Sequence, residues 1–284
     1  MSRLQTPDKP KVVDSTIVTG APNSGLAATG QFIAKSLSIA AMEVRKLRHD
    51  PMELLTRAIQ PLLWLLVFGQ VFGRLHALPT GDLTYTEFLA PGILAQSVLF
   101  VAIFYGISVI WERDLGIVHK FLVSPTPRAA LVLGKALSAG IRALSQAVIV
   151  YVAALALGVR LNLAPPALLG VLIFILLGAA LFATFSLIIA SLVKTRERFM
   201  GIGQVLTMPL FFASNAIYPI DMMPDWLKVI ARINPLTYLV DVLRALMLES
   251  GASSLGLGLD ALVLVGVLAL LVVVGARVYP RIVR

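Results

Sequence analysis

The chain has no cysteine, only three histidines among 284 residues, and only 14% charged residues. Without cysteine, disulfides, thiol catalysis and cysteine-ligated metals are excluded. His49, His76 and His119 are far apart and lack the spacing of metal ligands. A glycine-rich phosphate loop and a nucleophile elbow are also missing. We therefore expect no catalytic residue, metal site or cofactor in this chain.

Hydrophobic residues are abundant instead. They make up 58% of the chain, and the mean hydropathy is +0.89. A soluble exterior does not need that much apolar surface, so the lipid bilayer is the expected solvent. The net charge of +9 could indicate nucleic acid binding. However, lysine and arginine lie in short flanks of apolar runs, as membrane topology places them, so we expect no nucleic acid partner.

Six apolar segments have about the length that crosses a bilayer as a helix, roughly 20 residues. Residues 1–29 are polar and rich in proline, glycine, serine and threonine, without the apolar core of a signal peptide. We expect them to form a disordered cytoplasmic tail, and residues 30–284 to form one all-α transmembrane domain. The expected spans are 58–76, 88–111, 136–158, 167–193, 199–220 and 255–277.

The distribution of positive charge predicts the orientation. With six spans, 18 of the 24 lysine and arginine residues fall on the side of the termini and five on the other side. Cytoplasmic loops carry the excess of positive charge. The sequence therefore predicts a multi-pass protein of the cytoplasmic membrane with both termini in the cytoplasm.

Residues 35–49 place apolar side chains at helical spacing, with basic side chains between them. This pattern is typical of an amphipathic helix lying along the inner leaflet. A solvated linker helix before the first span is the alternative. The basic residues that we expect at this cytoplasmic interface are Arg45, Lys46 and Arg48.

The segment between the last two spans predicts two short helices, Asp225–Ile233 and Leu236–Glu249, separated by Asn234-Pro235. A helix of nine residues is only about 14 Å long, roughly half of the hydrocarbon core. We expect a re-entrant helical hairpin that dips into or caps the outer leaflet. Within it, Asp241 and Arg244 could form an exposed ion pair, which would add little stability. A folded cap without substrate contact is the alternative.

Arg142 is the one ionisable residue well inside an expected span. Such a charge is costly and indicates a functional role. Since Arg142 follows Lys135 by only seven residues, about 10 Å of helix, snorkelling to the headgroups is the favoured interpretation. The spans lack the central Asp, Glu or His of a proton-coupled carrier, so we expect the energy source to lie in another protein.

The charged segment between the second and third spans carries a recognisable pattern. It contains Glu112-Arg113-x-x-Gly116, then Leu122-x-x-Pro125-x-x-Arg128 and Gly134-Lys135. The outer segment reads Pro219-x-x-x-Met223-Pro224-x-Trp226-Leu227, followed by Asn234-Pro235-Leu236-Thr237-Tyr238. In both motifs the chain resembles the ABC-2 type permeases, the membrane subunits of ATP-binding-cassette exporters such as the daunorubicin-resistance and nodulation-type systems.

The resemblance implies that the loop after the second span docks in a separate cytoplasmic ATPase, which binds ATP and Mg. Gly116 would permit a turn or a close backbone approach there. The local alternative is that Glu112 and Arg113 only cap the span. The implied coupling residues are Glu112, Arg113, Asp114, Gly116 and Lys120, and Arg128 joins the cytoplasmic interface.

The resemblance also implies two permease copies, identical or paralogous, around one pathway, with the outer hairpin as gate. The pathway looks apolar, although its aromatic side chains could instead face lipid or pack in the core. The implied gate residues are Tyr218, Pro219, Met223, Pro224, Trp226, Asn234, Pro235, Tyr238, Asp241 and Arg244. The candidate pathway residues are Phe100, Phe104, Phe211, Phe212 and Asn215.

These expectations describe an exporter of a hydrophobic or amphipathic cargo such as a drug, lipid or glycolipid. A polysaccharide or lipid-linked glycan exporter of the same architecture, a self-contained secondary transporter and a membrane-embedded enzyme are the alternatives. Fold alone does not choose the substrate.

Overall fold

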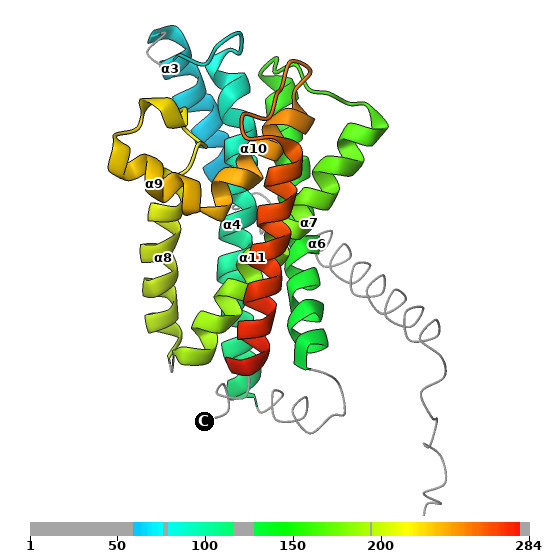
Figure 1. The fold of residues 1–284 in the computed structure, drawn as a ribbon, viewed down its shortest axis with the longest axis vertical. Coiled ribbons are helices and arrows are strands. Elements are labelled where there is room, and N and C mark those ends of the chain that lie inside the picture. Colours follow the sequence, from blue (N-terminus) through cyan, green and yellow to red (C-terminus); the bar gives the residue numbers. More distant parts are fainter. Residues whose placement is uncertain (1–58, 76–78, 116–127, 194, 279–284) are drawn as a thin grey trace, which may run out of the picture.

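The computed structural model describes residues 59–75, 79–115, 128–193 and 195–278. These residues are helical apart from turns and one isolated bridge between Leu161 and Leu248 (Figure 1). The long helices are α4 (Tyr85–Asp114), α6 (Arg128–Ala156), α7 (Pro165–Leu192), α8 (Arg196–Phe212) and α11 (Leu257–Val278). The short elements are π-helix η1 (Trp64–Phe68), α3 (Gly69–Leu75), 3-10 turn η2 (Ile220–Met222), α9 (Asp225–Ile233) and α10 (Pro235–Met247).

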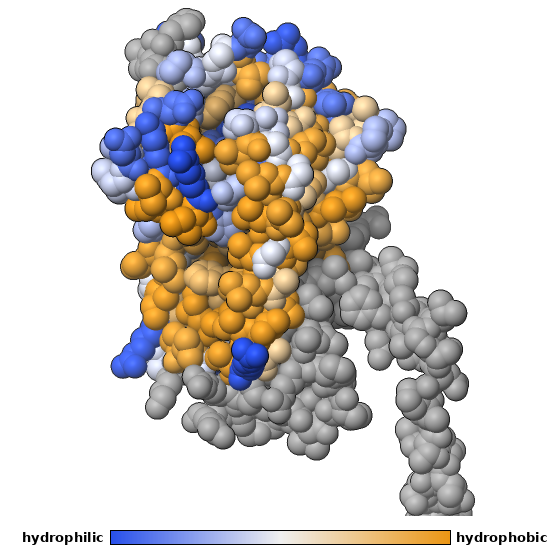
Figure 2. Space-filling view, in the orientation of Figure 1, coloured by the Kyte–Doolittle hydropathy of each residue, from blue (hydrophilic) through white to orange (hydrophobic). Residues whose placement is uncertain are grey.

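Among the residues that the structure describes, four helices are long and apolar enough to span a membrane. On the face shown in Figure 2, apolar side chains form a broad band, and hydrophilic ones gather towards its upper and lower ends. This agrees with the expected class of an all-helical membrane protein. The four candidate spans are Tyr85–Ile107, Ala139–Ala156, Pro165–Leu192 and Leu257–Val278.

The span expected over 199–220 extends beyond the corresponding helix at its C-terminal end. Helix α8 stops at Phe212 after 17 residues, which gives roughly 26 Å of helix. The chain then turns, because the Ser214 hydroxyl donates to the carbonyl of Phe211 over 2.7 Å and accepts from the amide of Ala216 over 3.3 Å. A local hydrogen bond of this kind competes with continuation of the helix.

The first expected span, 58–76, is described from residue 59 and stays helical to Leu75. Its middle is the π-helical turn η1, whose Trp64 stacks on Phe68 with ring centroids 4.3 Å apart. Trp64 also meets Phe211 of α8 edge-on at 5.5 Å. These aromatic contacts fasten the first helical segment to the end of α8.

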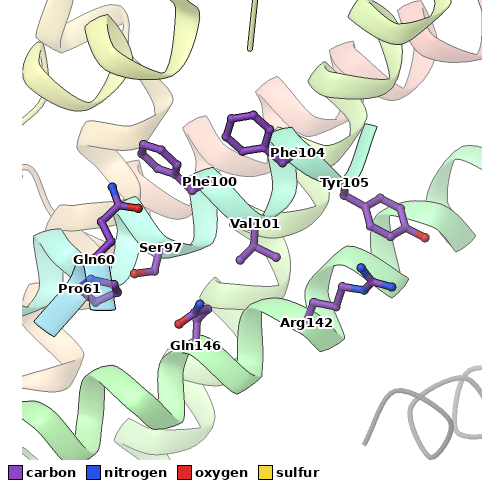
Figure 3. A pocket seen from close by; sticks show the side chains of 9 residues that line it. All are labelled: Gln60, Pro61, Ser97, Phe100, Val101, Phe104, Tyr105, Arg142 and Gln146. Carbon is purple, nitrogen blue, oxygen red and sulfur yellow. The ribbon is translucent and has the colours of Figure 1, made fainter. Parts of the chain in front are cut away.

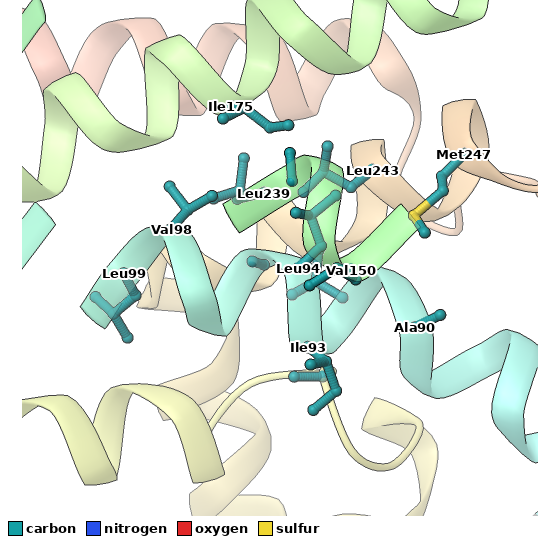
Figure 4. Packing of buried hydrophobic residues seen from close by; sticks show 14 of the residues in the cluster. Ala90, Ile93, Leu94, Val98, Leu99, Val150, Ile175, Leu239, Leu243 and Met247 are labelled. Carbon is teal, nitrogen blue, oxygen red and sulfur yellow. The ribbon is translucent and has the colours of Figure 1, made fainter. Parts of the chain in front are cut away.

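Helix α4 occupies the centre of the fold. Of the residues in its span, 78% are buried, against 11% for α11, which therefore lies at the periphery. Helix α4 packs against α6, α7, α8 and α10, and part of the resulting core is drawn in Figure 4. Its labelled members include Ile93, Leu94 and Val98 of α4, Val150 of α6, Ile175 of α7, and Leu239 and Leu243 of α10.

The backbone of α4 passes very close to the turn after α8. A methyl group added at Gly92 would collide with the backbone of Ala216. At Gly178 of α7, an added methyl would lie 2.6 Å from the side chain of Leu239. Glycine at these positions lets the turn after α8 sit directly on α4 and lets α10 sit directly on α7.

The two short helices of the hairpin differ in burial. Helix α9 has the expected bounds but is mostly exposed, with Trp226 66% and Ile233 76% accessible. Helix α10 begins at Pro235 and ends at Met247, two residues earlier than expected, and most of its side chains are buried against α4, α7 and α11. The carbonyl of Met247 accepts from the amide of Asn162 over 2.9 Å, which ties the end of α10 to the α6–α7 loop.

Candidate functional site

The end of α4 is fastened to the turn between α7 and α8 by charged groups. The Arg113 guanidinium donates to the carbonyl of Val193 over 3.0 Å and forms an ion pair with Asp114 at 3.2 Å. Asp114 in turn accepts from Arg196 of α8 over 2.8 Å. The Arg196 guanidinium lies 3.7 Å from the ring centroid of Trp111. We call Trp111, Arg113, Asp114 and Arg196 the α4–α8 cluster.

In the α4–α8 cluster, charged side chains connect the end of α4 to the start of α8 at the protein surface. Hydrogen bonding from Arg196 is the main cause that lowers the pKa of Asp114, and Arg113 lowers it further. Asp114 therefore stays a carboxylate between two cations. Since the carboxylate is solvent-exposed, the pair adds little to stability. Its main consequence is geometric, because it fixes where α4 ends relative to α8.

Two expected coupling residues, Arg113 and Asp114, thus lie together with Arg196. Glu112 lies in the last turn of α4, and Arg128 is the first residue of α6. Gly116 and Lys120 fall outside the described residues, as do the tail 1–29 and the interface residues Arg45, Lys46 and Arg48. Sequence alone did not identify Arg196 as the partner of Trp111, since a contact between positions so far apart leaves no local pattern.

At the opposite end of α4, Asp241 of α10 is buried and accepts three hydrogen bonds. Its donors are the hydroxyl of Ser253 at 2.8 Å, the hydroxyl of Ser254 at 2.7 Å and the amide of Leu255 at 3.0 Å. The expected exposed ion pair with Arg244 is therefore wrong. Asp241 instead organises the turn that leads into α11.

Arg244 is also buried, but it faces α4. Its guanidinium donates to the carbonyls of Asn215 at 2.8 Å and Phe88 at 3.4 Å, and lies 3.9 Å from the Phe88 ring centroid. Burial lowers the pKa of Arg244 to about 10, and the attraction of Asp241 opposes this shift. Arg244 thus remains a cation at neutral pH and joins α10, α4 and the turn after α8.

Ser253 connects Asp241 to a second buried carboxyl, Asp260 of α11. The Ser253 oxygen lies 2.8 Å from Asp241 Oδ2, 3.0 Å from Asp260 Oδ2 and 2.6 Å from the amide nitrogen of Gly256. A serine hydroxyl has one hydrogen to donate. Asp241 accepts two further hydrogen bonds, from Ser254 and Leu255, so we assign the Ser253 hydrogen to that carboxylate. The contact with Asp260 then requires a hydrogen on the Asp260 carboxyl. This inventory predicts that Asp260 is protonated.

Asn234, between α9 and α10, is a bridging residue. Its side-chain oxygen accepts from the amide of Leu236 over 3.0 Å and so caps α10. Its amide nitrogen donates to the carbonyls of Leu210 at 2.7 Å and Ala213 at 2.9 Å, at the end of α8. One side chain therefore positions the start of α10 on the end of α8.

The other expected gate residues shape the connections around the hairpin. The Tyr218 hydroxyl donates to the carbonyl of Phe212, and the Tyr238 hydroxyl donates to that of Arg232 over 2.6 Å. Both rings thus fold back onto the preceding helix. The remaining gate residues are Met223, which is buried, Trp226, which is exposed on α9, Pro219 and Pro224, which precede η2 and α9, and Pro235, the first residue of α10.

A cavity of about 380 Å³, cavity 1, opens between residues 59–63, α4 and α6 (Figure 3). Phe100 and Phe104, two of the expected pathway residues, line it. Phe211 is instead buried against Trp64, and Phe212 also lies beside that ring. The full lining is Gln60, Pro61, Ser97, Phe100, Val101, Phe104, Tyr105, Arg142 and Gln146.

A second cavity of about 380 Å³, cavity 2, lies at the hairpin. Asn215, the fifth expected pathway residue, borders it together with Asp241 and Arg244. Asp221 and Arg232 add charge to its rim. Within the described ranges, no three His, Cys, Asp or Glu side chains are grouped as metal ligands.

Comparison with known proteins agrees with this architecture. The family model described as "ABC-2 type transporter" matches residues 36–248. A putative transport permease, ycf38, of Cyanophora paradoxa is 30% identical over 209 residues, covering 72% of this chain and 71% of that protein. The daunorubicin resistance ABC transporter permease protein DrrB1 of Streptomyces coeruleorubidus is 26% identical over 285 residues, covering 95% of this chain and 96% of that protein.

Nodulation protein J of Rhizobium leguminosarum bv. trifolii is 29% identical over 197 residues, which are 69% of this chain and 74% of that protein. The family match spans most of the chain, including the described part of α4 through α10. On this evidence, the chain belongs to the ABC-2 type transporter family of membrane-spanning transport permeases.

Proposed function

We propose that this chain is the permease subunit of an ATP-binding-cassette exporter in the cytoplasmic membrane, with six spans and both termini in the cytoplasm. A separate ATPase subunit would bind ATP and Mg and dock at the end of α4. The observation that carries the proposal is the α4–α8 cluster, in which Asp114 joins Arg113 to Arg196. It gives a docked partner a single charged surface built from two helices.

Helix α4 connects the proposed docking surface to the outer hairpin. Its 30 residues make about 45 Å of helix. One end carries Asp114, and near the other end the carbonyl of Phe88 accepts from Arg244 of the hairpin. Because α4 is packed along its length, a displacement imposed at Asp114 would be carried to α10 as a rigid-body movement rather than absorbed by bending.

Export then follows as alternating exposure of a pathway shared by two permease copies, identical or paralogous. The outer hairpin would act as the gate, with α10 as its embedded part and α9 as its exposed part. Cargo that is hydrophobic or amphipathic fits a route along apolar spans. One relative is a daunorubicin resistance permease and another is a nodulation protein. A drug, lipid or glycolipid is the substrate class that we propose.

A glycan exporter of the same architecture remains the alternative within this class. A self-contained secondary transporter is less well supported. In the four candidate spans that the structure describes, the acidic residues are Glu87 and Asp260, each near one end of its helix. A proton relay through the membrane centre would need such groups farther along the spans.

The test compares Asp114→Asn with Asp225→Asn. Asp225 is an exposed acidic residue on α9, so it controls for loss of one surface charge. Each variant is co-expressed and purified with the ATP-binding-cassette ATPase that serves as its partner, and both complex recovery and ATPase activity are measured. We expect Asp114→Asn to lose complex or cargo-stimulated activity, and Asp225→Asn to keep both. Equal behaviour of the two variants would overturn the proposed docking surface.

A further inference from the structure

Cavity 2 has buried residues at its floor and exposed residues at its mouth. Its volume of about 380 Å³ lies in the range of small-molecule sites. The buried lining residues are Phe88, Asn215, Asp241 and Arg244. The exposed lining residues are Pro79, Asp221, Arg232, Ala252 and Ser254. The cavity therefore leads from the surface at the outer hairpin to a set of buried polar groups.

Two of the buried residues each carry a polar atom that has no hydrogen-bond partner in the described part of the chain. These atoms are Nε of Arg244, which is a donor, and Oδ1 of Asn215, which is an acceptor. Arg244 is 6% exposed and Asn215 is 2% exposed. The two residues are neighbours, because Nη2 of Arg244 donates to the carbonyl of Asn215 over 2.8 Å. Since buried polar groups are rarely left without a partner, the pair indicates a ligand that supplies both an acceptor and a donor.

The chemistry of these two atoms favours hydroxyl groups. A hydroxyl has one hydrogen to donate and two lone pairs that accept, so hydroxyls can accept from Arg244 Nε and donate to Asn215 Oδ1. A phosphate dianion or a carboxylate would satisfy Arg244 but would place further acceptor oxygens against Asn215 Oδ1. An ammonium group would satisfy Asn215 but would lie against the cationic guanidinium of Arg244.

The charges around the cavity also favour a neutral ligand. Asp221 and Asp241 line it together with Arg232 and Arg244, so the formal charges of its lining sum to zero. A lining without net charge gives an anion or a cation no general attraction. Apolar side chains complete the lining and can contact the C–H faces of a ring. They are Leu83, Ile220 and Leu255, with Pro79 and Pro219.

We propose that cavity 2 binds a neutral, hydroxyl-rich headgroup, namely one sugar unit, on the outer side of the permease. Arg244 and Asn215 hold hydroxyl groups of the sugar, and the apolar lining contacts the faces of its ring. This inference rests on the proposed function and deepens it, because it assigns a glycosylated cargo and a site that holds the headgroup before release.

The position of the cavity along α4 fits this role. Phe88 precedes Asp114 by 26 residues, about 39 Å of helix. In the proposed orientation, cavity 2 therefore lies at the outer end of α4, where the headgroup of an exported molecule arrives last. Both Arg244 and Asn215 belong to the connection between the hairpin and α4, so a bound sugar would touch the proposed gate directly.

The experiment uses the full-length chain in phosphatidylcholine nanodiscs without the ATPase. The probes are hexyl glycosides of glucose, galactose and mannose, each with a diazirine on the alkyl chain and a tritium label. Hexyl phosphate and hexanol with the same diazirine and label are the anionic and the sugar-free comparisons. After illumination, the label bound to the protein is counted over a range of probe concentrations, with and without the matching methyl glycoside.

At least one hexyl glycoside should label the protein more strongly than hexyl phosphate and hexanol do. The matching methyl glycoside should displace it, because the sugar and not the alkyl chain is recognised. Mass spectrometry should map the label to the lining of cavity 2, within residues 79–83, 219–221 or 252–255.

Asn215→Leu removes the acceptor that lacks a partner and keeps the backbone carbonyl that binds Arg244. It should lower the affinity for the glycoside about three- to tenfold, the usual effect of losing a neutral hydrogen bond. Its unfolding temperature should not fall, because the atom that it removes is buried without a partner. The matched control is Gln204→Leu, which removes an exposed amide of α8 outside cavity 2 and should leave binding unchanged.

Glycoside labelling that no methyl glycoside displaces would show that the cavity holds water alone, and would overturn the proposal. Stronger labelling by hexyl phosphate, or equal affinity of Asn215→Leu and the unmodified chain, would overturn it as well. If Asn215→Leu is not recovered in a folded form, the comparison of probes on the unmodified chain decides. Because no ATPase is present, a failure here leaves the proposed coupling to the ATPase untouched.

Discussion

The two ends of α4 hold their charges in opposite ways. Near Tyr85, Arg244 and Asp241 are buried, and backbone carbonyls, amides and hydroxyls bind them. Near Asp114, the charged side chains are partly or largely exposed and bind one another. A buried charge is strongly destabilising when it loses its partner, so buried charges of this kind stabilise one arrangement of the helices. Exposed ion pairs contribute little to stability and leave a charged surface to which another protein can bind. This difference is the basis of our proposal that one end is structural and that the other is a docking surface.

The largest expected effect is the loss of Arg244. Arg244→Ala would leave the carbonyls of Asn215 and Phe88 without their donor and open a cavity beside Phe88. We expect a loss of about 3–5 kcal/mol in stability, or failure to recover folded protein. Thermal unfolding of the purified chain in detergent measures this. Arg232→Ala on the exposed α9 is the matched control, and an equal loss there would contradict the contrast.

The next effect distinguishes the two buried carboxyls. Asp241→Asn removes an acceptor oxygen from a group with three donors, so we expect a loss of about 2–3 kcal/mol. Asp260→Asn should lower the stability by less than about 1 kcal/mol, since an amide replaces a carboxyl that already donates a hydrogen. Infrared spectra report directly whether the Asp260 carboxyl is protonated. The band of a protonated carboxylic acid should disappear in Asp260→Asn and persist in an unmutated chain.

A smaller effect is expected at Asn234, which has separable roles. Asn234→Asp keeps the acceptor that caps α10 but loses the donors to Leu210 and Ala213. Asn234→Ala loses both. We expect Asn234→Ala to lose about 2 kcal/mol of stability, and Asn234→Asp to lose more, because its buried carboxylate would lie against two carbonyl oxygens. Thermal unfolding measures both losses, and a milder effect of Asn234→Asp would show that the contacts with Leu210 and Ala213 contribute nothing beyond the cap.

The smallest effect on stability is expected at the exposed end. Arg196→Gln breaks the ion pair with Asp114 and the contact with Trp111. Since these groups are exposed, we expect a change of about 0.5 kcal/mol or less in stability. ATPase activity of the complex should nevertheless fall several-fold, because the docking surface loses its geometry. If Arg196→Gln instead lowered the stability of the chain and left the ATPase activity of the complex unchanged, this end of α4 would be structural and not a docking surface.

The sequence predicted the parts of the fold that local patterns encode. The apolar runs that became α4, α6, α7 and α11 were found, as was the pair of short helices separated at Asn234. A run of apolar residues is sufficient to predict a span, because the bilayer requires one. Proline and asparagine likewise mark a helix start locally.

Contacts between distant positions could not be predicted in this way. The spacing of Asp241 and Arg244 predicts an exposed ion pair. In the structure, Asp241 binds the turn before α11 and Arg244 binds α4. The hydrogen bonds from Asn234 to the end of α8, more than 20 positions earlier, likewise leave no local pattern. Phe211 is a predicted pathway residue, and in the structure its ring packs against Trp64. Each of these outcomes is set by a partner that the local pattern does not name.

The most direct test of the docking claim uses the absence of cysteine in the chain. Leu115→Cys places a single thiol beside Asp114, at a position 68% exposed, and Ile233→Cys places one on α9, 76% exposed. Each variant is treated with a bifunctional thiol–amine cross-linker in membranes that also contain the ATPase. We expect a cross-linked complex with the ATPase from position 115 and none from position 233. Cross-linking from position 233, or from neither position while the complex is intact, would contradict docking of the ATPase at the end of α4.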